Sequence, residues 1–180
     1  MISLWLFGRG CERLDAVGEQ RMRWTVAAML APIRPGVSFA CAAWPAHVTL
    51  ASNLRLDDPT TLPGVVDDAL RDVGSLDARL GRMAWFGERE DVPVLLVAST
   101  GIERAHERLA TALVQLPGFA ADAPRQWRAG YRPHLTLGAA VPMPTGDRVA
   151  IACVAIARLD GADAVVEAVL PPPAARRAAS

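Results

Sequence analysis

Apolar residues follow two different spacings along the chain, and these spacings predict a mixture of strands and helices. Continuous or alternating apolar runs predict strands at 2–7, 38–42, 47–53, 77–86, 94–99, 134–140, 149–159 and 164–170. Apolar residues three or four positions apart predict helices over 12–30, 61–73 and about 102–116. Proline and glycine close several of these segments, so the residues between them are predicted to form turns and irregular loops.

The predicted elements occur twice in the same order. A strand, a helix and a histidine-bearing strand follow one another from Ile2 to Leu50, and again from Val94 to Leu137. The first histidine lies 45 residues after its strand begins, and the second lies 40 residues after. We therefore expect two pseudo-equivalent α+β lobes whose sheets face each other. Residues 1–170 would form this single bilobal domain, and residues 171–180 a flexible C-terminal tail.

Two short motifs carry the candidate chemistry. They are Ala46-His47-Val48-Thr49-Leu50 and Pro133-His134-Leu135-Thr136-Leu137-Gly138. Alternate residues of a strand share a face, so each histidine should point the same way as the threonine two residues later. Each motif would then present an imidazole and a hydroxyl together on one surface, with the leucines and the valine directed into a core.

A pair of imidazoles suits acid–base chemistry at a phosphate. The ordinary histidine pKa of about 6.5 allows one ring to be neutral and another protonated near neutral pH. The neutral ring can take a proton from an attacking water, and the protonated ring can donate one to the departing oxygen. The hydroxyls of Thr49 and Thr136 could donate hydrogen bonds to the non-bridging phosphate oxygens. A lone histidine on a strand is usually structural, but two copies at matching places favour a functional role.

The paired motifs, 87 residues apart, resemble those of the 2H phosphoesterase superfamily. The opening Met1-Ile2-Ser3-Leu4-Trp5-Leu6-Phe7, followed by Pro45-Ala46-His47-Val48-Thr49-Leu50, is similar to the start of its cyclic phosphodiesterase branch. The resemblance extends over residues 1–140 and, at lower specificity, over the closing strands. One departure is Ala46, which stands where the family often has proline. The motif pair is specific for the superfamily and not for a substrate.

The resemblance implies both a fold and a reaction. The fold is α+β, with two pseudo-symmetric lobes that are each an antiparallel sheet with helices on the outside, and with the facing sheets forming a central cleft. The reaction is hydrolysis of a cyclic phosphodiester without metal or cofactor, on a 2′,3′-cyclic nucleotide or on ADP-ribose 1″,2″-cyclic phosphate. By analogy His47 would protonate the departing 3′ oxygen and His134 would activate water, although the near-symmetry permits the reverse. Thr49 and Thr136 correspond to the family's phosphate-binding positions.

Arginines and aromatic residues gather in Arg125–Arg132, directly before the second motif. Arg132 could contact a phosphate there, and Tyr131 or Trp127 could stack on a base. A solvated loop with one aromatic residue packed on the core is the alternative. We select Tyr131 and Arg132 as substrate-binding candidates, since Tyr131 is the only tyrosine and lies three residues before His134.

Trp44, His106 and the three cysteines have simpler interpretations. Trp44 lies three residues before His47 and either lines the cleft or packs in the core, of which packing is the usual role. His106 lies on a predicted helix without a threonine partner, so we expect a structural or surface histidine. The three cysteines match no zinc pattern, and we expect reduced, partly buried thiols in a cytoplasmic protein.

Composition narrows the range of partners. Just over half of the 180 residues are apolar, the net charge is zero, and all 19 basic residues are arginine. A neutral chain has no global field to attract long nucleic acid. No apolar stretch is long enough to span a bilayer, so no membrane partner is expected. These features favour a small nucleotide cyclic phosphate as the partner, with RNA 3′ ends as a further possibility.

Two other functions stay open at this point. The first is action on RNA ends, as a 2′,3′-cyclic phosphodiesterase or by 2′–5′ RNA ligation. This function needs a basic track beside the site, for which only the segment Arg125–Arg132 is available. The second is a non-catalytic module that binds a nucleotide phosphate. The complete set of two histidines and two threonines argues against this module.

Overall fold

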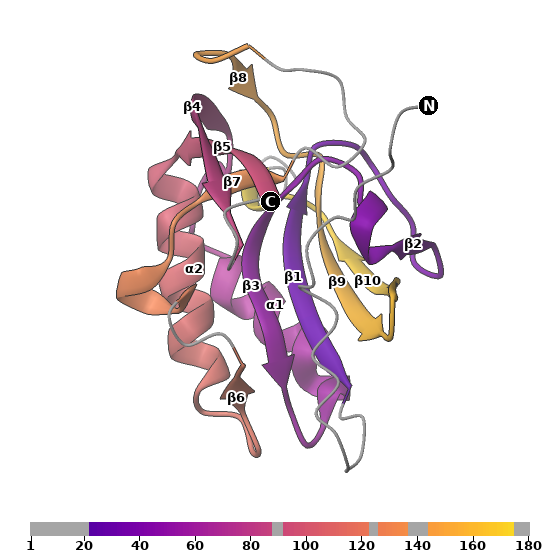
Figure 1. The fold of residues 1–180 in the computed structure, drawn as a ribbon. Coiled ribbons are helices and arrows are strands. Elements are labelled where there is room, and N and C mark those ends of the chain that lie inside the picture. Colours follow the sequence, from indigo (N-terminus) through magenta and orange to yellow (C-terminus); the bar gives the residue numbers. More distant parts are fainter. Residues whose placement is uncertain (1–21, 88–91, 123–125, 137–143, 175–180) are drawn as a thin grey trace, which may run out of the picture.

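A computed structural model describes residues 22–87, 92–122, 126–136 and 144–174. Its ten strands form one antiparallel sheet in the order β2-β10-β9-β1-β3-β7-β5-β4-β8, with β6 paired to β3 outside this path (Figure 1). The strands are β1 Arg23–Met29, β2 Ser38–Ala40, β3 His47–Arg55, β4 Ala78–Phe86, β5 Val92–Ala98, β6 Ala120–Ala121, β7 His134–Thr136, β8 Arg148–Val149, β9 Cys153–Asp160 and β10 Asp163–Leu170. The α-helices are α1 Leu62–Leu70 and α2 Thr100–Leu113, and short 3₁₀ turns lie at Cys41–Ala43, Pro59–Thr61 and Arg128–Gly130.

The α+β class and most of the predicted elements are confirmed. The main error is the predicted helix over 12–30, because its second half, Arg23–Met29, is strand β1. This strand lies between β9 and β3, and every residue from Trp24 to Met29 is buried. A strand that is covered on both faces is apolar throughout, and such a run cannot be distinguished from a buried helix by periodicity. The predicted strand over 2–7 lies outside the described residues.

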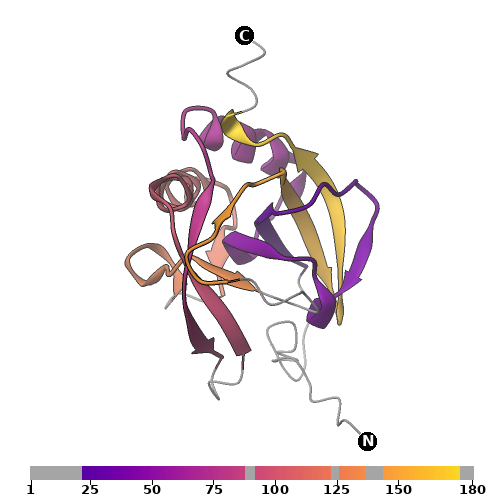
Figure 2. The ribbon, with the colours of Figure 1, turned by 90° about the horizontal axis from the view of Figure 1, so that it is seen from above.

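Among the described residues, the strand–helix–strand order is present in the second half of the chain. There, β5, α2 and β7 follow one another as expected. In the first half, β1 leads through β2 and a 3₁₀ turn to β3, and helix α1 comes after the histidine strand. The two halves also meet edge to edge through β3 and β7 and form one curled sheet rather than two separate sheets (Figure 2).

Both helices cover the same face of the sheet, and the main core lies between them and the strands (Figure 1). Ser99 caps the start of α2, where its hydroxyl accepts a hydrogen bond from the Ile102 amide. The buried stripes of the two helices then pack together with the inward residues of β3, β5, β7 and β9. These helix residues are Leu62, Val66, Leu70, Ile102, Ala105, Leu109 and Leu113. In the part of the chain that is described, no helix is long and apolar enough to cross a membrane.

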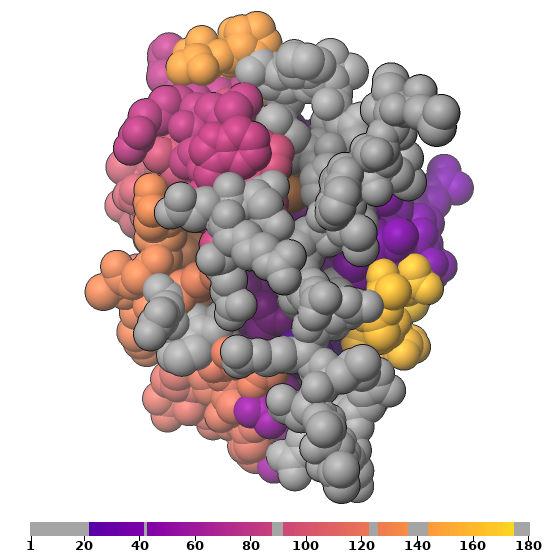
Figure 3. Space-filling model, in the orientation of Figure 1, coloured from indigo at the N-terminus to yellow at the C-terminus, as the bar shows by residue number. Residues whose placement is uncertain are grey.

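The face of the sheet away from the helices has a second apolar cluster in the first half of the fold. It is built on small residues of β1, β9 and β10, to which Met29 and Trp44 add larger side chains. Figure 3 views the molecule from this side, with the segment around β4 on the left and β10 on the right. Because both faces of β1 and β9 are packed, the register of the central strands is strongly fixed.

Gly101 allows helix α2 to approach the preceding loop closely. A Cβ atom at this position would lie 1.8 Å from the carbonyl oxygen of Ser75. We expect Gly101→Ala to lower the free energy of unfolding by roughly 1–3 kcal/mol, because backbone must move to admit the methyl group. The matched control is Gly64→Ala in α1, where nothing lies within 4 Å and alanine should add about 0.5–1 kcal/mol. Chemical denaturation measures both, and equal effects of the two substitutions would contradict this account of the helix contact.

Candidate functional site

Strands β3 and β7 bring the two histidine motifs side by side. The strands are antiparallel, with His47 opposite Thr136 and Val48 opposite Leu135. The same register continued by one step places Thr49 opposite His134. The two motifs are therefore related by a local two-fold axis, and the two histidines are diagonal neighbours. Diagonal positions in such a pair lie about 7–8 Å apart, within reach of two rings that contact one small group.

The two histidines and the two threonines lie on one face of the sheet. The residues between them, Val48 and Leu135, are fully buried in the core under the helices. Alternation therefore directs the histidine and threonine side chains to the opposite face, which we call the site face. On its other side, His47 of β3 pairs with Met29 of β1, which belongs to the apolar cluster on that face. The site thus lies where the packed half of this face meets strand β7.

Each imidazole is held by a carbonyl two residues before it. His47 Nδ1 lies 2.8 Å from the Pro45 oxygen, and His134 Nδ1 lies 2.8 Å from the Arg132 oxygen. A carbonyl oxygen only accepts, so Nδ1 must carry the hydrogen in both rings. Nε2, at the other side of each ring, is then the nitrogen that can gain and lose a proton. Both motifs present this same nitrogen for acid–base work.

An aromatic ring lies against each histidine. The centroids of Trp44 and His47 are 4.9 Å apart, and those of Phe86 and His134 are 4.6 Å apart. Trp44 is 7% exposed, so packing rather than lining an open surface is its main role. His47 is also only 7% exposed, whereas His134 is half-buried. The two halves of the site share a geometry and differ in their access to solvent.

Burial shifts both histidines toward the neutral form. Desolvation lowers the pKa of His47 to about 4, and the charge of protonated His134 adds to this effect. The pKa of His134 is also lowered, first by burial and then by the positive charge of Arg132, while the carbonyl bond opposes both. In the free protein near pH 7, both rings are therefore neutral bases.

Arg132 is exposed and lies beside the second histidine. Its guanidinium carbon is 5.0 Å from the centroid of the Phe86 ring, over which it forms a cation–π contact. Its backbone oxygen holds His134, and its charge lowers the pKa of that residue. The structure thus brings Arg132 together with His134 and Phe86. An anion next to His134 would lie within the field of this cation.

Tyr131 lies elsewhere, on the side of the helix-covered core. Its ring stacks on His106, with centroids 3.8 Å apart and an interplanar angle of 4°, and its hydroxyl donates to the Thr49 oxygen at 2.7 Å. Trp127 packs on His106 and Phe119. The structure therefore does not place Tyr131 or Trp127 to stack on a base beside the histidines. His106 itself is 1% exposed and structural, as expected.

Phe86 is the site residue that sequence analysis missed. It lies at the end of β4 opposite Val92 of β5, in the register that continues through Val94 to Thr136 of β7. This places Phe86 on the site face. Its only sequence signal is the final position in an apolar strand, and the β-bulge between Leu80 and Met83 removes a simple alternation pattern from that strand.

Among the residues that the structure describes, no group of three or more His, Cys, Asp or Glu side chains is arranged to hold a metal ion. The expectation of reduced cysteines is wrong for Cys41, which takes part in a disulfide, whereas Cys153 is free and buried. Cys11 lies outside the described residues, as does Arg125.

The two histidine motifs, which resemble those of the 2H phosphoesterases, lie on adjacent strands of one curled α+β sheet. The model of one family, described as the 2′-5′ RNA ligase superfamily, matches residues 27–168. The chain belongs to this superfamily, which places it among enzymes that hydrolyse or ligate phosphoesters. No curated protein matches the chain significantly.

Solved structures share the fold at low sequence identity. The protein TT0787 of Thermus thermophilus is 18% identical, with a TM-score of 0.51, over 84% of this chain and 98% of that one. A protein described as a phosphoesterase is 15% identical with a TM-score of 0.53 over the same shares. E. coli LigT, crystallised in complex with NADP+, is 15% identical with a TM-score of 0.51 over 86% of this chain and 99% of its own.

The lowered pKa values can be measured without knowledge of the substrate. In an NMR titration of the free protein, we expect His47 to titrate near pH 4 and His134 below pH 6.5, because burial disfavours the charged rings. His47 should therefore charge only as the pH falls through this acidic range, and the free energy of unfolding should fall between pH 6.5 and 4. A His47 that titrates at or above the ordinary histidine pKa of about 6.5 would show that the ring is hydrated in solution.

Proposed function

We propose that the chain hydrolyses a cyclic phosphodiester, either a 2′,3′-cyclic nucleotide or an ADP-ribose 1″,2″-cyclic phosphate. The observation that carries this proposal is the register of β3 and β7, with His47 opposite Thr136. This register supplies two imidazoles and two hydroxyls to one face, in a two-fold arrangement that matches the tetrahedral symmetry of a phosphate. The Nε2 atoms can then approach the phosphorus from opposite sides.

The reaction needs one proton to enter and one to leave. His134 Nε2 takes a proton from water as the water oxygen bonds to phosphorus, and His47 Nε2 gives its proton to the 3′ oxygen as the bond from phosphorus to that oxygen breaks. The product is a 2′-phosphate, and the proton gained by His134 returns to His47 through solvent. The hydroxyls of Thr49 and Thr136 donate to the non-bridging oxygens, where negative charge increases. Arg132 adds a positive charge on the His134 side.

The roles of the two rings follow from the resemblance, and the local two-fold symmetry fits the reverse direction equally well. The depressed pKa of His47 means that this ring is neutral in the free protein near pH 7. As an acid it must first gain a proton, which the negative charge of the bound phosphate stabilises. Substrate binding and protonation of His47 are therefore coupled, and each favours the other.

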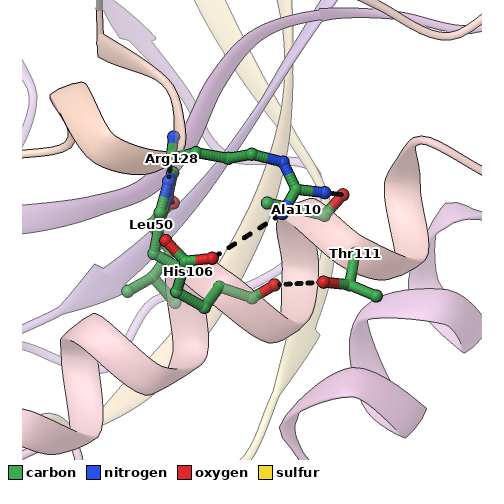
Figure 4. Close-up of polar contacts among 6 residues, drawn as sticks. Leu50, His106, Ala110, Thr111 and Arg128 are labelled. Atoms are coloured by element: carbon green, nitrogen blue, oxygen red, sulfur yellow. Dashed lines mark hydrogen bonds and ion pairs between the residues drawn. The ribbon is translucent and has the colours of Figure 1, made fainter.

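The description of the family favours a second candidate, action on RNA ends or 2′–5′ RNA ligation. Such a substrate needs basic residues along the path of the chain. Arg128 does not offer one, because its side chain bonds the Ala110 oxygen and lies 3.7 Å from Glu107 (Figure 4). Arg132 alone, of the described arginines in this segment, is placed at the site. The small nucleotide is therefore the preferred substrate, and the same assay can distinguish the two.

The test uses purified protein with EDTA and three substrate sets: nucleoside 2′,3′-cyclic phosphates together with the ADP-ribose compound, RNA oligomers that end in a cyclic phosphate, and 2′–5′ linked dinucleotides. We expect opening of a small cyclic phosphate. His47→Ala and His134→Ala should each lower kcat/KM by about 10²–10⁴-fold, because each removes a proton-transfer group. Thr49→Ala and Thr136→Ala should each cost roughly 10–100-fold, since each removes one hydrogen bond to a charged group.

The matched control is Thr111→Ala, which removes an exposed hydroxyl of α2 that bonds only the Glu107 oxygen within its own helix (Figure 4). This variant should keep the parent's activity. Parent-like activity in both histidine variants would disprove the mechanism, and a strict preference for the RNA oligomers would select the second candidate.

A further inference from the structure

Side chains bind two backbone carbonyls of strand β3. These are the carbonyls of Thr49 and Leu50, the two residues that follow His47 and Val48. Tyr131 donates its hydroxyl to the Thr49 oxygen at 2.7 Å, and His106 donates Nδ1–H to the Leu50 oxygen at 2.8 Å. Both donors come from outside the sheet ladder, His106 from α2 and Tyr131 from the segment before β7. They act on Thr49, which carries a phosphate-binding hydroxyl in the proposed function, and on its neighbour.

The sheet itself explains why side chains are needed here. Against β1, Thr49 pairs with Ala27 and Ala51 with Val26, so Leu50 is the extra residue of a β-bulge. Such a residue has no partner in the ladder, and its carbonyl needs another donor. Against β7, β3 is paired at His47 and Val48, and this pairing does not extend to Thr49 or Leu50. His106 and Tyr131 supply the donors at this interruption.

The two donors form one rigid unit. Their rings are stacked, and His106 Nε2 accepts a hydrogen bond from the Arg128 amide at 2.9 Å (Figure 4). An amide nitrogen only donates, so His106 is the neutral tautomer with its hydrogen on Nδ1. Burial lowers the pKa of His106, so its ring stays neutral and Nε2 remains an acceptor, and burial raises the pKa of Tyr131, so its hydroxyl keeps the hydrogen that it donates.

Besides the pairing of β3 with β7, this unit makes a second connection between the two histidine motifs. Tyr131 lies three residues before His134, and its hydroxyl bonds the backbone of Thr49 in the other motif. Among the described residues, the direct pairing between β3 and β7 comprises two residue pairs. The hydrogen bond from Tyr131 to the Thr49 oxygen therefore adds a contact between the two motifs beyond the paired strands.

We propose that Tyr131 and His106 are positioning residues, which hold the backbone of Thr49 and Leu50 so that the Thr49 hydroxyl meets the phosphate bound between His47 and His134. This proposal rests on the proposed function and adds to it two residues that never touch the substrate. It also gives Tyr131 a different role from stacking on a base. Tyr131 acts through Thr49, and this dependence can be tested.

The experiment is a double-mutant cycle with Tyr131→Phe and Thr49→Ala, assayed on a nucleoside 2′,3′-cyclic phosphate well below the melting temperature. Tyr131→Phe keeps the stacked ring and removes only the hydroxyl. We expect it to lower kcat/KM by about 5–10-fold in the parent and by less than about 2-fold in the Thr49→Ala background. Equal losses in both backgrounds, or no loss in the parent, would overturn the positioning role.

Ile102→Val is the stability control. Ile102 is fully buried in α2 but makes no bond to β3, and losing one methyl group should cost about 0.5–1.5 kcal/mol of stability, similar to one hydrogen bond. It should leave kcat/KM unchanged. At His106, Asn can still donate to the Leu50 oxygen and should keep most activity, whereas Leu should not. An Asn variant as poor as the Leu variant, with both folded, would argue against the donor role.

A readout without catalysis separates this proposal from the proposed function. Three-bond NMR couplings report the χ1 rotamer of Thr49, which should be single in the parent and in Ile102→Val but averaged in Tyr131→Phe. If the parent hydrolyses no substrate while this difference is present, the proposed reaction fails and the positioning contact stands. An unchanged Thr49 rotamer in Tyr131→Phe would refute the positioning contact whatever the activity.

Discussion

The antiparallel contact between β3 and β7 is the constraint on which the whole site depends. It joins the halves of the sheet and sets His47 opposite Thr136. Side chains alternate along a strand, so a slip of one residue would turn His134 and Thr136 into the helix-covered core. Because Leu135 and Val48 are fully buried in that core, such a slip would also expose large apolar side chains. The packing that stabilises the fold therefore fixes the chemical register.

Burial has a second consequence at this contact. The apolar surroundings that fix His47 also lower its pKa to about 4, so the ring is neutral near pH 7 and holds a proton only weakly. Arg132 contributes in the same direction at His134. A negatively charged phosphate is the kind of ligand that reverses both effects. In the proposed reaction, the charge needed for acid catalysis would therefore develop when an anion is bound.

The sequence alone was sufficient to find the two histidine motifs and to predict which of their side chains share a face, because alternation along a strand is a local property. It was insufficient where the answer depended on neighbours. Arg23–Met29 is a strand because β9 and β3 flank it, which an apolar run cannot reveal. Phe86 reaches His134 through the combined registers of β4, β5 and β7. Tyr131 was singled out for its position near His134, but its hydroxyl and ring are committed to Thr49 and His106.

The central claim is that two imidazoles from separate halves of the chain meet around one phosphorus atom. A crystal structure of the protein with adenosine 2′-monophosphate, the product class of the proposed reaction, measures this directly. The account predicts the phosphate on the site face, with Nε2 of His47 and of His134 each within hydrogen-bond distance of different oxygens of that phosphate. A phosphate bound by only one of the two rings, or at another part of the surface, would contradict it.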